Sequence, residues 1–406
     1  DKLATAVRKD LGESLQKIHL RTVPLVRATT NSLEALKCLS NANLAGGNSK
    51  YGEAKEFLQE AIELDPEFAL AHANLASYYY WTNDRVKGEA HISIALNLLN
   101  RLTEKERLWI QAAVEGYRGN RDAALVKWGT YLSKYPNDYG GWFRLGYNYM
   151  RMGRYEESIS AFTRSLEIYN DDDPNILINI ASCYSLLYEY NKSVDYYQQA
   201  FRLNPDKLTV SNLNHEFGFT YVQMGELQKA REVFEKMTSE DDEKKARGNR
   251  SLALLSMYSG RYSEAISLIR ESILIQKSLG NELSELRDRL YLAKMYQVTG
   301  LSVKYATELE KCSDLIFDAA SEPMWYLILG KMFIRSGEKE KAELLLEEIS
   351  KISNQGNRND KAAYNIIKGE IELLKENHTE SLELMESATT LRSDAYTLES
   401  LGNYFF

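Results

Sequence analysis

The feature that most constrains this chain is a pattern of bulky and small residues that recurs about every 34 positions. Its clearest copy reads Trp142, Leu145, Gly146, Tyr149, Gly153, Tyr155, Ser158, Phe162 and Ser165. The same spacing recurs on both sides of this copy, and we count ten copies in residues 31–391. One such unit cannot bury its own apolar face, so consecutive units stack on one another. We therefore predict a repeat array and not a series of independent globular domains.

This spacing resembles the tetratricopeptide repeat, in which each copy is a pair of antiparallel helices. The resemblance implies an all-α fold, an α–α superhelical solenoid of about ten helix-turn-helix repeats. The small residue at the eighth position of each copy would let the two helices approach closely. Prolines agree with this register, because they fall where second helices end or first helices begin: Pro66, Pro136, Pro174, Pro205 and Pro323.

The segments that flank the repeats have patterns of their own. Residues 1–30 are predicted to form an amphipathic helix and a linker, since apolar residues recur there at helical spacing: Leu3, Val7, Leu11, Leu15 and Ile18. The apolar stripe of this helix needs a partner. Asn31, with Glu34 three residues on, is predicted to cap the first repeat helix. Residues 392–406 are predicted to be a partial or capping helix.

Composition argues against several classes of partner. The net charge is −8 and the pI is about 5.5, so no overall electrostatic attraction draws the chain to nucleic acid or to anionic lipid. No apolar run reaches the length that spans a bilayer, and we expect no direct membrane insertion of this segment. The three cysteines fall in different repeats, which argues against a disulfide framework or a zinc site.

We find no motif that supports catalysis. Gly47 and Gly52 have the spacing of a phosphate loop, but Glu53 and Ala54 stand where Lys and Ser or Thr are required. A nucleophile elbow and a Cys–His pairing are also missing from the sequence. We predict no catalytic, cofactor-binding or metal-binding residue; an enzyme subunit with a site built across repeats is the alternative. The charged stretch 239–247 is predicted to be a solvated turn between repeats.

A set of cations marks the first candidate binding surface. In this architecture the first helices line the concave face, and their exposed positions in the seventh to ninth repeats include Arg247, Arg250, Arg287, Lys294, Lys331 and Arg335. One interpretation is that they capture an acidic peptide or a terminal carboxylate through charge-assisted hydrogen bonds. The other is a solvated face whose cations pair with glutamates on neighbouring helices.

Aromatic residues mark a second candidate surface. Phe143, Tyr147 and Met150 in the fourth repeat, with Tyr80 and Trp81 in the second, could form a groove for an apolar peptide. Packing between adjacent repeats is the alternative. On either surface the expected partner is a protein or peptide.

A more specific resemblance lies at the junction before the repeats, in the stretches Leu11-Gly12-Glu13-Ser14-Leu15, Pro24-Leu25 and Ala28-Thr29-Thr30-Asn31-Ser32-Leu33-Glu34-Ala35-Leu36. It resembles the repeat region of bacterial membrane-anchored serine/threonine protein kinases. The resemblance implies a sensory or docking region outside the membrane, with kinase activity only in another part of the gene product; otherwise the segment would be cytoplasmic. A structural or assembly scaffold of the cell envelope is the alternative, with self-association through the last helix.

Overall fold

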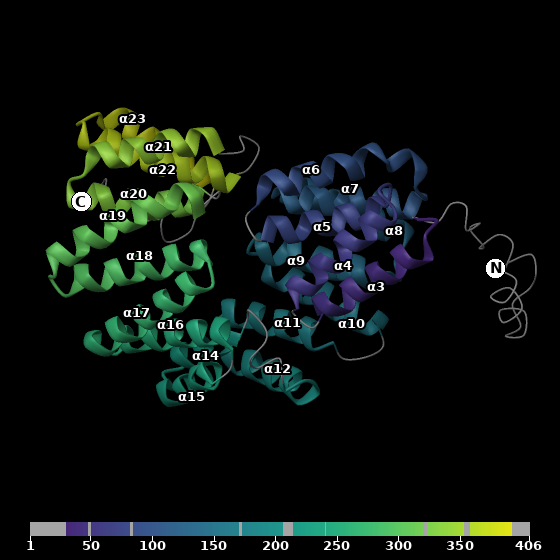
Figure 1. Ribbon diagram of the computed structural model, residues 1–406, viewed down its shortest axis with the longest axis horizontal. Helices are drawn as coiled ribbons and strands as arrows, with labels where there is room; N and C mark the ends of the chain where they lie inside the picture. Colours follow the sequence, from purple (N-terminus) through teal and green to yellow (C-terminus); the bar gives the residue numbers. More distant parts are fainter. Residues whose placement is uncertain are drawn as a thin grey trace, which may run out of the picture. The chain divides into compact units, whose positions relative to one another are not determined.

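The computed structural model describes residues 30–47, 50–81, 84–169, 173–205, 214–239, 241–319, 323–352 and 358–391. Across these residues there are twenty α-helices, one short 3₁₀-helix and no strand (Figure 1). The predicted all-α fold of paired helices is confirmed. Contacts divide the chain into two compact units, residues 1–183 and residues 184–406, a division that the repeat pattern did not predict.

The first unit is built of consecutive helix pairs in which each helix packs against the next. The pairs are α3 (Leu33–Gly47) and α4 (Tyr51–Leu64), α5 (Ala69–Trp81) and α6 (Arg85–Asn97), α7 (Glu104–Arg118) and α8 (Arg121–Lys134), and α9 (Tyr139–Arg151) and α10 (Tyr155–Tyr169). A 3₁₀-helix, η2 (Leu99–Arg101), precedes α7. The next helix, α11 (Pro174–Leu186), runs from the first unit into the second.

The second unit continues the same arrangement. It contains α12 (Tyr190–Leu203), then α14 (Asn214–Gln223) with α15 (Leu227–Thr238), α16 (Asp242–Tyr258) with α17 (Tyr262–Ser278), α18 (Glu282–Val298) with α19 (Ser302–Ala319), α20 (Pro323–Ser336) with α21 (Lys339–Ile352), and α22 (Arg358–Leu374) with α23 (His378–Leu391). First helices also contact first helices, as α14 contacts α16 and α20 contacts α22. In each of these two cases, neighbouring first helices therefore form a common surface.

Close approach within a pair depends on the small residue at the eighth position. A Cβ atom on Gly146 would lie 2.8 Å from the ring of Phe162, and one on Gly218 would lie 2.2 Å from the ring of Phe234. Both phenylalanines are fully buried. In the pair formed by α9 and α10, Ser158 Oγ also donates a hydrogen bond of 2.8 Å to the carbonyl of Gly146. The predicted role of the small residue is confirmed for these two repeats.

The turns inside eight of the helix pairs contain a residue with a left-handed backbone. Glycines supply it in six pairs, with φ between 71° and 82°: Gly119, Gly153, Gly225, Gly260, Gly300 and Gly337. Tyr188 (φ 62°) and Glu376 (φ 61°) take the same place between α11 and α12 and between α22 and α23. A side chain with a Cβ atom is strained in this conformation, so these two turns are less stable than the glycine turns.

The start of the first helix differs from the sequence prediction. The helix α3 begins at Leu33, and Ser32 Oγ accepts a hydrogen bond of 3.1 Å from the Ala35 amide. Ser32 and not Asn31 is therefore the capping residue, because the helix starts one residue later than its sequence pattern suggested.

Two predicted segments, residues 1–29 and residues 392–406, lie outside the described residues, as does the side chain of Trp81. Within the part of the chain that is described, no helix combines the length and the apolar character needed to cross a membrane. Over the same residues, His, Cys, Asp and Glu side chains form no group of three that could hold a metal ion.

Candidate binding surface on the first helices

The helix α16 carries the first residues of the candidate surface because it starts earlier than expected. Asp241 caps it, with its Oδ1 accepting a hydrogen bond of 3.0 Å from the Lys244 amide. The stretch 239–247, predicted to be a turn, is therefore largely the beginning of a 17-residue helix, and that prediction is wrong. The acidic cap, together with Asp242 and Glu243 in the first turn, complements the positive end of the helix dipole. This stabilises a helix in a stretch whose many charges had suggested a loop.

Asp288 of α18 is the centre of the surface. Its side chain is fully buried, and its Oδ1 lies 3.1 Å from Arg250 Nη1 on α16. Ser272 Oγ of α17 donates a hydrogen bond of 2.6 Å to the other carboxylate oxygen. A buried carboxylate is stable only when it is paired and hydrogen-bonded, and here α16 and α17 supply those partners.

Arg287 stands next to this pair but is poorly neutralised. Its Nε is 3.6 Å from Asp288 Oδ1, and its Nη2 donates a hydrogen bond of 3.2 Å to Ser284 Oγ. The Nε itself is buried and makes no hydrogen bond to any described residue. Burial and the nearby charge of Arg250 lower the pKa of Arg287 to about 10. The described residues therefore leave one donor of this guanidinium without a hydrogen bond.

Two further arginines, Arg247 and Arg250, act electrostatically on Arg287. We call Arg247, Arg250 and Arg287 the arginine cluster. Glu243, an exposed residue, pairs with Arg247 at 3.2 Å, and Asp241 pairs with Lys244 at 2.9 Å. Asp288 is closer to Arg250 than to Arg287, and partial burial strengthens electrostatic attraction at this place. The site is suited to an added carboxylate.

The other three predicted cations are placed differently. Lys331 on α20 is 4% exposed and lies 3.3 Å from Glu370 Oε1 on α22, which makes it part of a buried ion pair and not of an open surface. Lys294 is exposed and donates to Gln297 Oε1 at 3.0 Å. Arg335 is exposed in the last turn of α20. The structure thus gathers three of the six cations, and Arg250 and Lys331 pair with acids from neighbouring first helices.

Apolar side chains continue the surface toward the carboxyl ends of α16 and α18. Along α18, four residues at helical spacing share one face: Arg287, Tyr291, Lys294 and Val298. Tyr258 ends α16 and is 68% exposed, and Val298 ends α18 and is 50% exposed. The sequence analysis did not include Tyr258 and Val298 in the candidate surface. Each lies four residues after a first-helix position, Leu254 or Lys294, and this spacing could have indicated that they share its face.

The predicted aromatic groove in the first unit is mostly packing inside helix pairs. The Phe143 ring lies 5.6 Å from that of Phe162 on the partner helix, and Tyr147 and Met150 are half-buried. Tyr80 packs against Gly88 and donates a hydrogen bond to Glu89 of α6. The structure does not bring Tyr80 and Phe143 together.

A different aromatic group does span several first helices. The Arg144 guanidinium of α9 lies 5.8 Å from the ring centres of both Trp109 and Tyr117 on α7. Tyr78 of α5 is half-buried, and burial raises its pKa, while the nearby Arg144 charge acts in the opposite direction. The Tyr117 hydroxyl is buried and has no hydrogen-bond partner among the described residues. Sequence reasoning missed this group because it considered other positions of the repeat.

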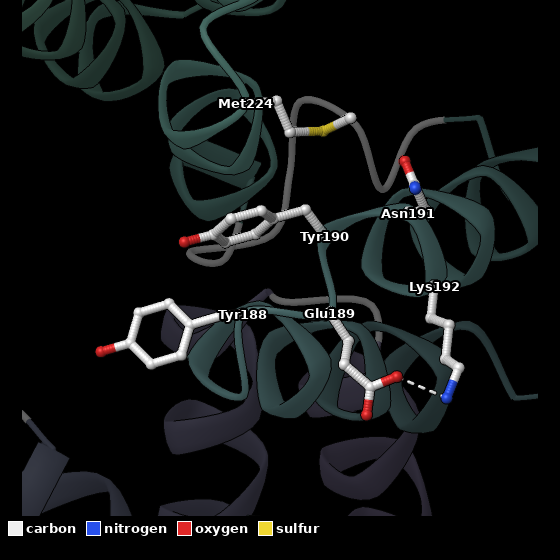
Figure 2. A pocket seen from close by; sticks show the side chains of 6 residues that line it. All are labelled: Tyr188, Glu189, Tyr190, Asn191, Lys192 and Met224. Carbon is white, nitrogen blue, oxygen red and sulfur yellow. Dashed lines mark ion pairs between the residues drawn. The ribbon is translucent and has the colours of Figure 1, made fainter.

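The second unit also has a shallow pocket at its turn edge, which Figure 2 shows. Tyr188 and Tyr190 lie on the same side of the turn, with ring centres 6.2 Å apart, and Met224 comes from the next pair. Glu189 and Lys192 pair with each other on one wall. The two charged groups of this pocket thus neutralise each other, which makes it a weaker candidate than the arginine cluster.

Comparison with known proteins identifies the repeat. Residues 141–206 and residues 42–68 match profiles of the tetratricopeptide repeat. The yeast Tom70 crystal structure is 14% identical, with a TM-score of 0.55 over 91% of this chain and 95% of that one. A tetratricopeptide repeat protein from Parabacteroides merdae is 17% identical, with a TM-score of 0.40 over 74% of this chain and 99% of that one.

A human IFIT1 dimer with PPP-AAAA is 15% identical, with a TM-score of 0.45 over 90% of this chain and 92% of that one. No curated protein matches the sequence significantly. Two segments thus match the repeat by sequence, the helix pairs continue it through the described residues, and the fold is that of Tom70. These two segments of the chain are tetratricopeptide repeats, and the described residues have the all-α fold of paired helices.

Proposed function

We propose that this chain is a non-catalytic scaffold that binds an acidic protein or peptide on the first helices of its second unit. The observation that supports this most directly is Arg287, whose buried Nε lacks a hydrogen bond among the described residues and lies 3.6 Å from Asp288 Oδ1, with the charge of Arg250 nearby. A ligand carboxylate would pair with the exposed part of this guanidinium, since the Arg287 side chain is 31% exposed.

The proposal extends to the apolar part of the same surface. About eleven residues of helix separate Arg247 from Tyr258 and Arg287 from Val298, a distance of roughly 16 Å at 1.5 Å per residue. A short peptide spans this length. We propose that its carboxylate contacts the arginine cluster and that its apolar side chains cover Tyr258 and Val298.

A peptide-display selection against the whole chain tests the proposal. We expect the enriched peptides to carry carboxylates, and binding of a labelled enriched peptide to weaken at least tenfold in Arg287→Gln. Arg287 suits the test because its loss leaves Asp288 paired with Arg250, so that the fold is retained. Affinity should also fall as salt rises.

The matched control is Lys277→Gln, which removes an exposed cation from the end of the second helix α17. It changes the net charge equally, and we expect the same affinity as in the unmodified chain. Selected peptides without an excess of acidic residues, or equal weakening by both variants, would show that the arginine cluster is only structural.

We also propose that the chain is the docking or sensory region of a larger signalling protein of the serine/threonine kinase type. The resemblance of the junction residues 11–36 supports this role. A docking region of this kind would bind its partner through the arginine cluster of the second unit. Sequencing the gene upstream of the codon for Asp1 tests it. We expect a kinase domain followed by a transmembrane helix, and a different upstream domain would refute the assignment.

A further inference from the structure

In the first unit, Arg121 is a cation at a position where other repeats have an aromatic residue. It is the first residue of α8. Four other second helices begin with tyrosine: Tyr51 of α4, Tyr155 of α10, Tyr190 of α12 and Tyr262 of α17. Arg121 Nη1 donates hydrogen bonds of 2.7 Å to the Gly116 carbonyl and 3.0 Å to Asn148 Oδ1 on α9. Both acceptors are neutral, and no described acidic residue forms an ion pair with this guanidinium.

Further cations lie near Arg121 on α9, which packs against both α7 and α8 (Figure 1). Arg144, Tyr147 and Arg151 follow one another at helical spacing, and Arg151 is exposed in the last turn of α9. Burial and the nearby charge of Arg151 lower the pKa of Arg121 to about 10, while Tyr147 acts in the opposite direction. Arg144 and Arg151 also form no ion pair with a described acidic residue. We call Arg121, Arg144, Tyr147 and Arg151 the α9 surface.

The first helices around the α9 surface carry few acidic residues, and those few are engaged elsewhere. The helices α5, α9 and α11 contain no Asp or Glu. In α7, Glu104 and Glu115 form ion pairs with lysines of α8, and Glu106 belongs to the cap of its own helix. Asp138, which caps α9, pairs with Lys105 at 2.8 Å. Although the whole chain is acidic, this part of the first unit therefore attracts an anion.

We propose that the α9 surface binds a peptide through a phosphorylated side chain, with Arg121 and Arg151 contacting the phosphate. A phosphate monoester carries a charge of about −1.5 to −2 at neutral pH and three acceptor oxygens, which match two guanidinium groups without acidic partners. A single carboxylate would neutralise only one of them.

Arg144 extends the same surface along the bound peptide. It lies seven residues before Arg151, a distance of roughly 10 Å along the helix, which about three extended residues of a peptide span. The rings of Trp109 and Tyr117 lie near its guanidinium, and the buried Tyr117 hydroxyl has no hydrogen-bond partner among the described residues. We therefore expect Arg144 and these rings to contact the peptide about three residues from the phosphate.

Three peptide libraries that differ only in their central residue test the proposal on the whole chain. One is centred on phosphoserine, one on serine and one on glutamate, in otherwise degenerate sequence. We expect the chain to retain peptides from the phosphoserine library, and the Kd of a labelled enriched peptide, measured by fluorescence anisotropy, to rise at least tenfold when its phosphate is removed. Equal retention of the glutamate library would overturn the proposal, because a carboxylate would then suffice. Equal retention of the serine library would show that no anion is recognised.

Arg121→Tyr is the deciding variant, because it gives α8 the residue with which four other second helices begin, so that the fold is retained. We expect it to bind the phosphopeptide at least tenfold more weakly, with thermal unfolding as the check on folding. Arg151→Gln, at an exposed position, should weaken binding in the same way without affecting the fold. The matched control is Arg164→Gln, which removes an exposed cation from the second helix α10 and should leave the affinity unchanged.

The variant Arg287→Gln distinguishes this site from the arginine cluster of the second unit. It should leave phosphopeptide binding unchanged, so that failure of one proposal does not entail failure of the other. Phosphopeptide binding that is lost in Arg287→Gln but kept in Arg121→Tyr would assign the phosphate to the second unit. Equal affinity in Arg121→Tyr, Arg151→Gln and the unmodified chain would also refute the proposal.

Discussion

Single small residues set the distance between the two helices of a pair, and Gly218 is the tightest case. A Cβ atom there would meet the buried Phe234 ring at 2.2 Å. We expect Gly218→Ala to lower the free energy of unfolding by about 1–3 kcal/mol, because the ring cannot move away in a close-packed interior. Urea denaturation followed by circular dichroism measures the change.

The matched variant for this prediction is Gly129→Ala. Gly129 is exposed within α8, and an added Cβ atom would meet nothing within 4 Å. The same substitution should raise stability there by about 1 kcal/mol through helix propensity. Stabilisation by both variants would mean that the pair formed by α14 and α15 yields to the extra methyl group.

A histidine pair gives the first unit a dependence on pH. His72 Nε2 lies 3.1 Å from the Pro66 carbonyl and must donate to it, so its Nδ1 accepts the proton of His91 Nδ1 at 2.9 Å. Burial lowers the pKa of both residues, although the Asp65 charge raises that of His72. Lys55 and Lys87 lie over the Tyr79 ring, on which His91 stacks.

Because both folded-state pKa values are lowered, stability is fully present above the unfolded value near 6.5 and is lost as the pH falls below it. We expect the urea midpoint to fall between pH 7.5 and pH 5.5. His91→Gln should reduce this fall, since the amide still donates to His72 but does not titrate in this range. An identical pH profile in the variant would contradict the role of the pair.

At the scale of elements, the turns inside helix pairs differ in strain. Glu376 holds φ at 61° where six other repeats have glycine. We expect Glu376→Gly to stabilise the chain by about 0.5–1 kcal/mol, because relief of the strain exceeds the entropy cost of glycine. Gly225→Ala, in an equally open turn, should destabilise by about 1 kcal/mol. Thermal unfolding compares the two, and stabilisation by Gly225→Ala would refute the argument.

Features of the fold that depend on local, repeated contacts could be predicted from the sequence, whereas features that depend on one cap or on a distant partner could not. Helix pairing was readable from Gly146 and Phe162, because their interaction is local and recurs along the chain. The start of α16 was not, because charged residues suit both a solvated turn and a helix start, and only the cap at Asp241 decides between them. The burial of Lys331 was equally hidden, since its partner Glu370 is 39 residues away.

Among the described residues, buried ion pairs join neighbouring repeats of the second unit in two places. Arg250 and Asp288 connect α16 with α18, and Lys331 and Glu370 connect α20 with α22. If one of the two joined repeats unfolded while its neighbour stayed folded, a buried charge would lose its partner, at a cost of about 3–5 kcal/mol. We therefore expect the helices α16 to α19 to exchange their amides as one cooperative group, and α20 to α23 as another.

Native-state hydrogen exchange at rising urea concentration measures these groups. In the variant Asp288→Leu, the amides of α16 and α17 should exchange independently of those of α18 and α19. The charge that couples the two repeats is gone, while leucine still fills the space of the aspartate side chain. Four independent openings in the unmodified chain would mean that apolar contacts alone govern cooperativity.

The same ion pairs determine at which repeat boundaries a truncation keeps each buried charge with its partner. A cut after α17 would keep Arg250 and discard Asp288, and a cut after α21 would strand Lys331 in the same way. A cut between α19 and α20 separates neither couple. For anyone who transplants the arginine cluster onto another scaffold, the smallest transferable block is therefore α16 to α19, two repeats and not one.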